Sequence, residues 1–201
     1  MTPSASEVKR RLVHASGATL PALYLLGAIS WRTLGYLFAA GSVVAGALEA
    51  VRLLVGLDWR VYDELTREYE QENVAGYALY TFSMTGVAFV FPPYAAVPGM
   101  LMLAVGDPIS GVLGSSEAGR AKRAGVIVAM FAVCLALALP VVLWRTDAAA
   151  PAAVVAAAVG ALAATLADGL TPVVQGYVVD DNLTIPPAAA VGIWAALRLL
   201  G

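Results

Sequence analysis

Charged residues are scarce in this chain. Asp, Glu, Lys and Arg together make up 13% of its 201 residues, against about 25% in a typical soluble domain. Hydrophobic residues account for 60% of the sequence. This composition excludes an ordinary soluble domain and predicts a protein that crosses the membrane several times.

Cysteine and histidine are also nearly absent, with Cys134 and His14 the single examples of each. One cysteine excludes an internal disulfide framework and a site built from several thiolates. The formal net charge of −2 gives no support to nucleic-acid binding, and no nucleic-acid-binding module is visible. The chemistry of the protein must therefore come from its few carboxylates and cations.

The apolar residues fall into seven stretches long enough to cross about 30 Å of hydrocarbon as helices, which takes roughly 20 residues each. These stretches are 12–29, 33–56, 74–91, 93–114, 124–144, 150–168 and 182–200. We predict an all-α fold, in which one polytopic membrane domain over residues 1–201 contains about seven transmembrane helices. The first stretch is predicted to be an uncleaved helix, because it is long and has no obvious small-residue cleavage site.

The basic residues predict how the bundle is oriented, because Lys and Arg concentrate in cytoplasmic loops. A cytoplasmic N-terminus places nine of them inside, namely Lys9, Arg10, Arg11, Arg52, Arg60, Arg67, Arg120, Lys122 and Arg123, and three outside, namely Arg32, Arg145 and Arg198. With this orientation the ionisable residues of the apolar stretches gather at the cytoplasmic end. They are His14, Glu49, Arg52, Asp107, Asp168 and the run Asp180-Asp181-Asn182.

Asp107 is the strongest candidate for a functional residue. It lies about seven residues, or roughly 10 Å, from the cytoplasmic end of the predicted helix 93–114. A carboxylate at this depth costs about 3 kcal/mol and is usually functional. Gly106, Ser110 and Gly114 form a small-residue stripe where a backbone or a ligand can come close, and Pro108 leaves a carbonyl in the preceding turn without its helical donor. The alternative role is a helix-packing aspartate.

Glu49 and Arg52 are three residues apart and can form an ion pair on one helical face. The pair either holds phosphate or metal, or simply lets Arg52 reach the interface while Glu49 orients it. His14 shares a helical face with Arg10 and Arg11. It either accepts a substrate proton or bonds a phosphate oxygen, or it is a helix-end histidine hydrogen-bonded to a loop carbonyl.

Two further segments favour phosphate and metal chemistry. The loop 114–123 contains Arg120, Lys122 and Arg123, and these cations suit a polyphosphate, although the loop lacks the lysine and hydroxyl residue of a P-loop. The acids Asp180 and Asp181 precede the last predicted helix. Asp181 or Asn182 would be its N-cap, and adjacent carboxylates at this point are suited to Mg²⁺.

These motifs resemble the CTP-dependent polyprenol kinase family, which includes dolichol kinases, phytol kinases and fungal-type CTP-dependent diacylglycerol kinases. The resemblance is carried by Lys9-Arg10-Arg11 with His14 and Gly17, Glu49 with Arg52, Gly106-Asp107 continuing to Gly111 and Gly114, and Asp181-Asn182-Leu183-Thr184-Ile185-Pro186. The last run is the most specific element, because the Gly-Asp element is shared with CDP-lipid synthases.

The resemblance implies transfer of the γ-phosphoryl group of CTP to a membrane lipid alcohol, with Mg²⁺ as cofactor. It implies that Asp107, Asp181 and Asp168 bind the metal and that Asp107 or His14 takes the proton of the hydroxyl. The residues expected to bind the nucleotide are Arg11, Glu49, Arg52, Gly106, Gly111, Gly114, Lys122, Arg123 and Asn182.

The chain departs from the family pattern at three points. Gly119-Arg120-Ala121-Lys122-Arg123 replaces the usual Gly-Lys-Lys-Ser, Asp168 stands where Glu is usual, and the chain is as short as the compact members. Two other functions compete with a kinase: a CDP-lipid synthase that attacks the α phosphate of CTP, and a transporter that uses the acids as a proton relay. The sequence leaves the identity of the lipid alcohol and the oligomeric state open.

Overall fold

The computed structural model describes residues 5–56, 66, 73–114, 122–170, 172–174 and 177–200, and it describes no side chains for residues 5–10, 173–174 and 177–178. Apart from one short β-ladder, the regular elements in these ranges are helices, as expected for an all-α fold. The loop residues 115–121, with Arg120, and residues 57–65 and 67–72, with Arg60 and Arg67, lie outside the described residues.

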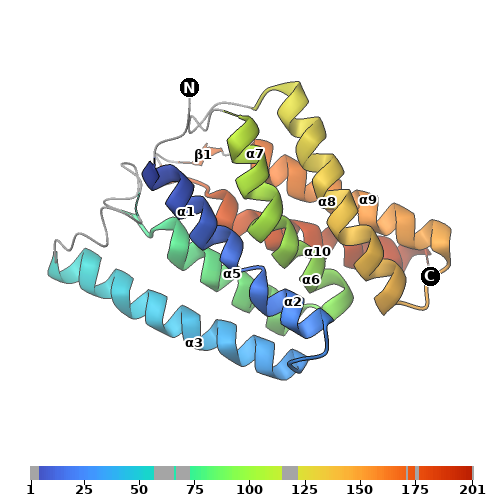
Figure 1. Cartoon of the computed structure of the whole chain (residues 1–201), viewed down its shortest axis with the longest axis horizontal. Helices are drawn as coiled ribbons and strands as arrows, with labels where there is room; N and C mark the ends of the chain where they lie inside the picture. Colours follow the sequence, from blue (N-terminus) through green and yellow to red (C-terminus); the bar gives the residue numbers. More distant parts are fainter. Residues whose placement is uncertain are drawn as a thin grey trace.

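The elements follow one another along the chain (Figure 1). They are α1 (Ala5–Ser16), α2 (Thr19–Leu25), α3 (Trp31–Ala50) with the π-helical turn η1 (Val51–Val55), α5 (Gly76–Val90), α6 (Pro93–Leu101), the π-helical turn η3 (Met102–Gly106), α7 (Asp107–Leu113), α8 (Ala124–Arg145), α9 (Ala150–Gly169), the antiparallel strands β1 (Val173–Val174) and β2 (Tyr177–Val178), and α10 (Asp181–Leu200).

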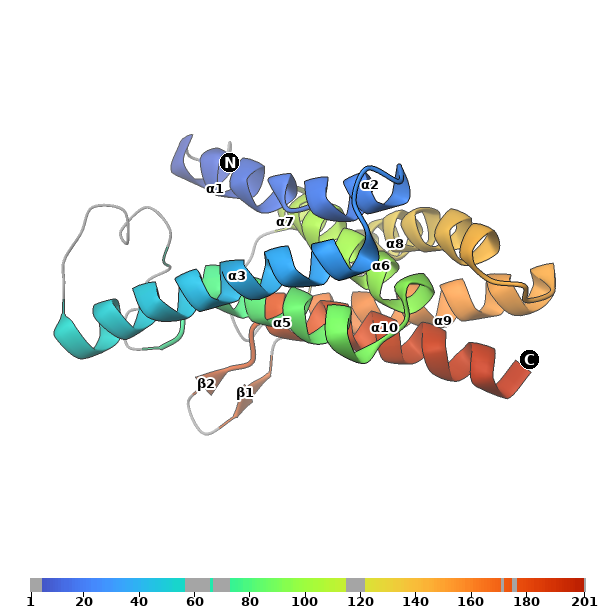
Figure 2. The same cartoon turned by 90° about the horizontal axis from the view of Figure 1, so that it is seen from below.

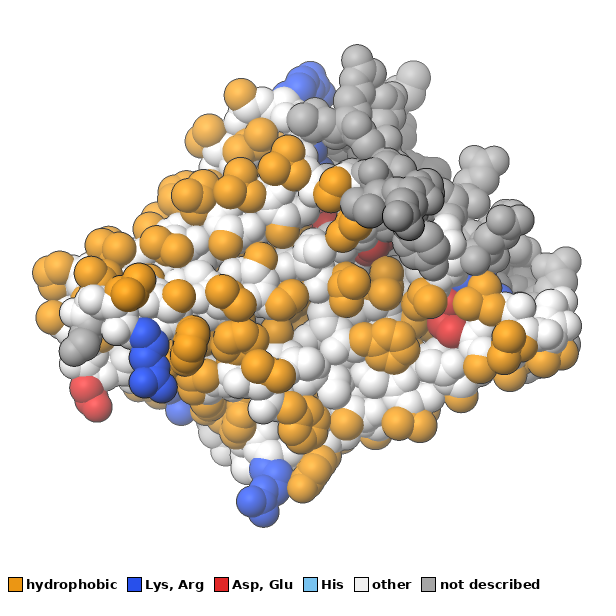
Figure 3. All heavy atoms as spheres, turned by 180° about the vertical axis from the view of Figure 1, so that it is seen from behind, with side chains coloured by type: hydrophobic (Ala, Val, Ile, Leu, Met, Phe, Trp, Pro, Cys, Tyr) orange, Lys and Arg blue, Asp and Glu red, His pale blue; other side chains and the backbone are white. Residues whose placement is uncertain are grey.

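Among the described residues, five helical segments are long and apolar enough to cross a membrane. They are Trp31–Val55, Pro93–Leu113, Ala124–Arg145, Ala150–Gly169 and Asp181–Leu200. Each agrees with a predicted stretch to within two residues at either end. Hydrophobic side chains are spread across the described part of the face seen in Figure 3, where charged side chains are few, as expected of a lipid-facing surface. The protein is therefore a membrane protein built from apolar helices.

Seven spans are not confirmed, because two predicted stretches are not long helices. The stretch 12–29 is divided between α1 and α2, so the prediction of one continuous helix there is wrong. The stretch 74–91 contains α5, which has 15 residues and is about 22 Å long at 1.5 Å per residue. Neither element alone matches the thickness of the hydrocarbon core.

A close contact explains why Gly17 stands between α1 and α2. A Cβ at Gly17 would lie 1.8 Å from the hydroxyl oxygen of Tyr80 on α5, so only glycine lets this tyrosine approach. The amide of Gly17 donates to the carbonyl of His14 in a three-residue turn that ends α1. The second helix then runs on along the same side of the bundle, and Figure 2 shows α1 and α2 on the side opposite the β1–β2 ladder.

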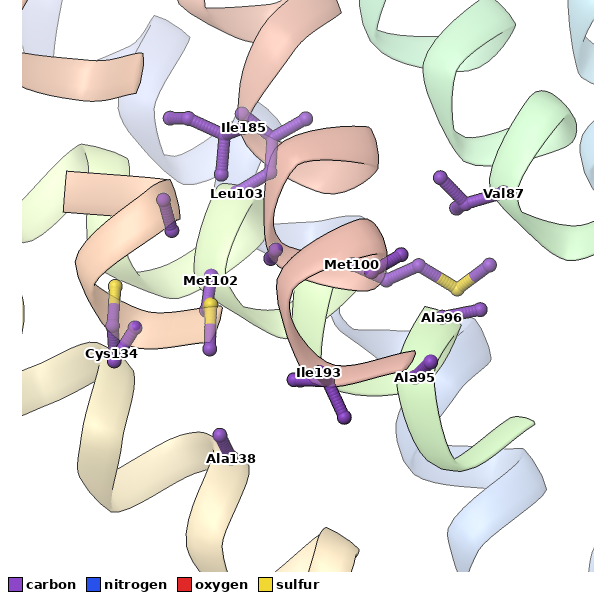
Figure 4. Close-up of a cluster of buried hydrophobic side chains, with 14 of the residues drawn as sticks. Val87, Ala95, Ala96, Met100, Met102, Leu103, Cys134, Ala138, Ile185 and Ile193 are labelled. Carbon is purple, nitrogen blue, oxygen red and sulfur yellow. The ribbon is translucent and has the colours of Figure 1, made fainter. Parts of the chain in front are cut away.

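Small residues bring α9 and α10 together, because they let helix backbones approach closely. A Cβ on Gly160 would lie 2.4 Å from a side-chain carbon of Ile193, and one on Gly192 would lie 3.2 Å from the Cα of Gly160. Figure 4 shows the core that results, in which Met102, Leu103 and Ile185 come from η3 and α10. This close packing determines where the ends of α9 and α10 lie, and those ends carry the candidate site.

Candidate functional site

Three carboxylates converge in the structure: Asp107 at the start of α7, Asp168 near the end of α9 and Asp181 at the start of α10. One oxygen from each lies within 4.8 Å of the others. Asp168 and Asp181 are buried, and Asp107 is partly exposed. We call these three residues the acid triad.

The π-helical turn η3 delivers both Asp107 and a free carbonyl to this region. The amide of Asp107 donates to the carbonyl of Met102, five residues back. In this register the carbonyl of Leu103 would accept from residue 108, but Pro108 has no N–H. His14 takes its place, because its Nε2 lies 2.9 Å from the oxygen of Leu103. The predicted carbonyl without a helical donor is therefore present, and His14 of α1 supplies its hydrogen bond instead.

His14 also faces Asp107, and its Nε2 lies 3.5 Å from the Oδ2 atom of that carboxylate. A carbonyl oxygen only accepts hydrogen bonds, so Nε2 carries a hydrogen. The ring nitrogen that remains able to accept a proton is Nδ1. Tyr80 packs edge-on against the imidazole, with ring centroids 4.7 Å apart. His14 is thus bonded to a backbone carbonyl, as in the second of the two alternatives, although this carbonyl belongs to η3 and not to a loop. Its role toward a substrate proton or phosphate stays a prediction.

Arg11 attaches α1 to α7 beside the acid triad. Its Nη1 donates to the carbonyl of Pro108 over 3.0 Å. A Cβ on Gly111 would lie 2.7 Å from the same nitrogen, so this glycine leaves the space that the guanidinium fills. Arg11 and Gly111 were both expected to contact a nucleotide, and the structure places them against each other.

Lys122 forms an ion pair with Asp168, in which Nζ and Oδ1 are 2.7 Å apart. Ser110 joins the pair, because its Oγ donates to Oδ2 of Asp168 over 2.7 Å and accepts from Lys122 over 3.0 Å. Arg123, the neighbouring cation, is exposed. Lys122 and Arg123, which were both expected to meet phosphate, are therefore in different environments.

The start of α10 is capped by Asp180, so the prediction that Asp181 or Asn182 is the N-cap is wrong by one or two positions. A side-chain oxygen of Asp180 accepts from the amide of Asn182 over 2.9 Å and from its side-chain nitrogen over 2.6 Å. Because Asp180 provides the cap, the carboxylate of Asp181 is not needed to cap the helix. The side-chain oxygen of Asn182 is buried and has no hydrogen-bond partner in the described part of the chain.

The predicted ion pair between Glu49 and Arg52 is confirmed, with nitrogen to oxygen distances of 2.9 and 2.6 Å. Glu49 also accepts from the amide of Ala75 and from the hydroxyl of Tyr77. These contacts tie the end of α3 to the start of α5. In the described part of the chain, Glu49 is not one of the acids that come within 4.8 Å of one another, so it is not a member of the acid triad.

Helix packing accounts for two glycines that were expected to bind the nucleotide. A Cβ on Gly106 would lie 3.1 Å from Met130, and one on Gly114 would lie 3.3 Å from Val126. Both contacts are made with α8. The small-residue stripe of α7 therefore lets α8 come close, and a role for Gly106 and Gly114 in binding a nucleotide stays a prediction.

Three hydroxyl groups of α5 that contact residues of the candidate site were not predicted from the sequence. Tyr77 donates to Glu49, Tyr80 to the carbonyl of His14 and Ser83 to the carbonyl of Asn182, the last over 2.6 Å. These residues recur every three positions and so lie close to one face of the helix. This three-residue spacing is the feature of the sequence from which they could have been predicted.

The donor set of the acid triad fits a hard divalent cation. All three ligands are carboxylate oxygens, which Mg²⁺ prefers over nitrogen or sulfur. Buried acids at this spacing repel one another unless positive charge lies among them. Asp107, Asp168 and Asp181 are thus the residues that would hold the metal, and the unpartnered oxygen of Asn182 lies on the residue next to Asp181.

Comparisons with family models, curated proteins and solved structures find no match to this chain.

Proposed function

We propose that this protein is an integral-membrane lipid kinase that transfers the γ-phosphoryl group of CTP to an isoprenoid alcohol of the polyprenol or dolichol type. The convergence of Asp107, Asp168 and Asp181 from three helices is the observation that carries the proposal. The order of the motifs along the chain and their resemblance to polyprenol kinases supply the donor and the class of acceptor.

The roles of the side chains follow from their positions. Phosphoryl transfer depends mainly on positioning and on charge stabilisation. The acid triad would hold Mg²⁺, which neutralises phosphate charge when bound. Arg11 and Lys122 lie beside the triad and would offset charge on the phosphate oxygens, joined by Arg123. Asp107, or Nδ1 of His14, would take the proton of the lipid hydroxyl.

The membrane arrangement is part of the same proposal. We place the N-terminus and the acid triad on the cytoplasmic side, where CTP is available, and count α1 with α2 and α5 as the two segments that complete a seven-segment bundle. The positive-inside distribution of Lys and Arg supports this orientation. The lipid chain would remain in the bilayer while its hydroxyl reaches the triad from the side.

A CDP-lipid synthase is the second candidate, because the Gly106-Asp107 element and a carboxylate triad also suit attack on the α phosphate of CTP. A transporter is less well supported. A proton relay needs acids spread through the depth of the membrane, whereas the described triad lies in one small region.

Labelled CTP separates the two enzymes. Purified protein is incubated with γ-³²P-labelled CTP, Mg²⁺ and one of four acceptors: a polyprenol, a shorter isoprenoid alcohol, a diglyceride or a phosphate-bearing lipid. Unlabelled ATP, GTP and UTP are tested as competing donors. A kinase puts the label into a chloroform-soluble product. Label in pyrophosphate, formed with a phosphate-bearing lipid, would identify a cytidylyltransferase. No labelled product with any acceptor would contradict both.

A further inference from the structure

Lys122 is the cation most closely engaged with the acid triad in the described part of the chain. Its ammonium group contacts a carboxylate oxygen of Asp168 and the hydroxyl of Ser110. The Lys122 side chain is 10% exposed and that of Asp168 is 2% exposed. The pair is therefore largely withdrawn from water, where charges interact strongly.

The partners of Lys122 lie on helices, but Lys122 does not. Ser110 belongs to α7 and Asp168 to α9, and backbone hydrogen bonds hold both. Lys122 lies two residues before α8, and Arg123, which joins it to that helix, has extended backbone angles. A lysine carries its charge on a flexible four-carbon stem. The ammonium can thus leave Asp168 without breaking helical hydrogen bonds.

The ammonium group of Lys122 would leave Asp168 if another cation offset the negative charge of the acid triad more fully. Three carboxylates within 4.8 Å repel one another, and Lys122 offsets part of that repulsion through Asp168. A divalent cation bound by all three carboxylates offsets more of it. The same cation repels an ammonium group that shares Asp168. Lys122 and a divalent cation at the triad would therefore compete for the carboxylate of Asp168.

We infer that Lys122 is an internal counter-cation of the acid triad, which pairs with Asp168 until a divalent cation displaces it toward the phosphate groups of the substrate. The inference rests on the proposed function, because it assigns the triad to a metal. It adds an order of events: the metal reaches Asp168 first, and the released ammonium then has three donors to offer to phosphate oxygens.

Metal binding without substrate tests the competition directly. Mn²⁺ alone is titrated into purified protein in detergent micelles, and free Mn²⁺ is followed by electron paramagnetic resonance. Lys122→Met removes the charge and keeps most of the stem. We expect it to bind Mn²⁺ about tenfold more tightly than the natural chain, the size of effect expected for loss of one competing buried charge. Unchanged or weaker binding would overturn the inference.

Two further variants make the test specific. Lys122→Gln keeps a hydrogen-bond donor for Asp168, so it serves as a second variant in case Lys122→Met does not fold. It should also bind Mn²⁺ more tightly than the natural chain. Arg123→Met removes the same charge from the adjacent, exposed position, and its affinity should change by less than about twofold, since exposed charges are screened. An equal gain in Arg123→Met would show a general charge effect and overturn the competition.

The outcomes also distinguish this inference from the proposed function. If the natural chain binds Mn²⁺ and Asp168→Asn weakens that binding, the metal site stands, and only the comparison with Lys122→Met decides the role of the lysine. If neither the natural chain nor Lys122→Met binds Mn²⁺, the metal site, the proposed function and this inference all fail.

Discussion

The bundle contains two acidic sites that differ in how their charge is satisfied: the single carboxylate of Glu49 and the acid triad. The Glu49 carboxylate receives hydrogen bonds from Arg52, from the amide of Ala75 and from Tyr77. The acid triad brings three carboxylates within 4.8 Å of one another. Lys122 forms an ion pair with Asp168, and Nε2 of His14 lies 3.5 Å from Asp107.

This difference separates a structural acid from a candidate functional one. A carboxylate surrounded by protein donors has its charge balanced within the fold, and it ties helices together. Carboxylates that gather on one point retain the ability to bind a cation from outside. Glu49, Asp168 and Asp181 are all buried, so burial alone does not make the distinction, and the groups around each carboxylate must be compared.

The largest effect should come from Asp107→Asn. Loss of one metal-binding carboxylate should lower kcat/KM for lipid phosphorylation roughly 1,000-fold, as removal of one charge-stabilising group can do. The measurement is transfer of label from γ-³²P-labelled CTP into lipid. Thermal unfolding of the variant should stay close to that of the natural chain. Phosphorylation at the natural rate would assign Asp107 to helix packing.

Glu49→Leu should act on stability instead. It removes the carboxylate that Arg52 contacts in a largely buried position and should lower the free energy of unfolding by about 3 kcal/mol. Denaturation in mixed micelles measures the change. The double variant Glu49→Leu/Arg52→Leu should recover part of the loss, because both members of the buried ion pair are then replaced by apolar side chains. A stable Glu49→Leu protein that has lost only phosphorylation would instead place this pair in the active site.

Magnesium should stabilise the folded protein by binding to the acid triad, and Glu49 should not contribute to this effect. At 100 times the dissociation constant, Mg²⁺ should add about 2.7 kcal/mol to the stability of the natural chain, and the same gain should appear in Glu49→Leu. Asp181→Asn should gain much less. Thermal unfolding with Mg²⁺ or with EDTA, at matched ionic strength, gives the comparison. An equal gain in Asp181→Asn would show that the ion binds elsewhere.

The smallest effect should come from His14→Gln. Glutamine can still donate to the carbonyl of Leu103, so α1 should remain in place, but it cannot accept a proton as imidazole does. We expect kcat to fall only about tenfold, because a loose transition state for phosphoryl transfer needs little activation of the nucleophile. A loss as large as that in Asp107→Asn would make His14 the essential base.

Most of the fold could be predicted from apolar runs, because a membrane helix must be long and apolar on its own account. This holds for α8 and α9, whose ends agree with the predicted stretches to within one residue. The division between α1 and α2 could not be predicted in this way. Tyr80 lies against Gly17 at this division, and this contact joins residues that are far apart in the sequence.

The site was predictable in its residue types but not in its pairings. Asp107 stands out as an acid in an apolar stretch, and the motif resemblance singled out Asp181 and Asp168. The pairing of Lys122 with Asp168 was not foreseen, because the two residues are 46 positions apart. For the same reason, nothing in the sequence showed that Gly111 makes room for Arg11.

The amino-acid sequence by itself determined that this chain is a helical membrane protein with rare acids in apolar segments, because hydrophobic length and the cost of buried charge are local properties. Only the tertiary structure decided which acids meet and which are already satisfied. Hydrogen bonds and ion pairs depend on distances of a few ångströms between helices, and those distances are set by how small residues such as Gly160 let the helices pack.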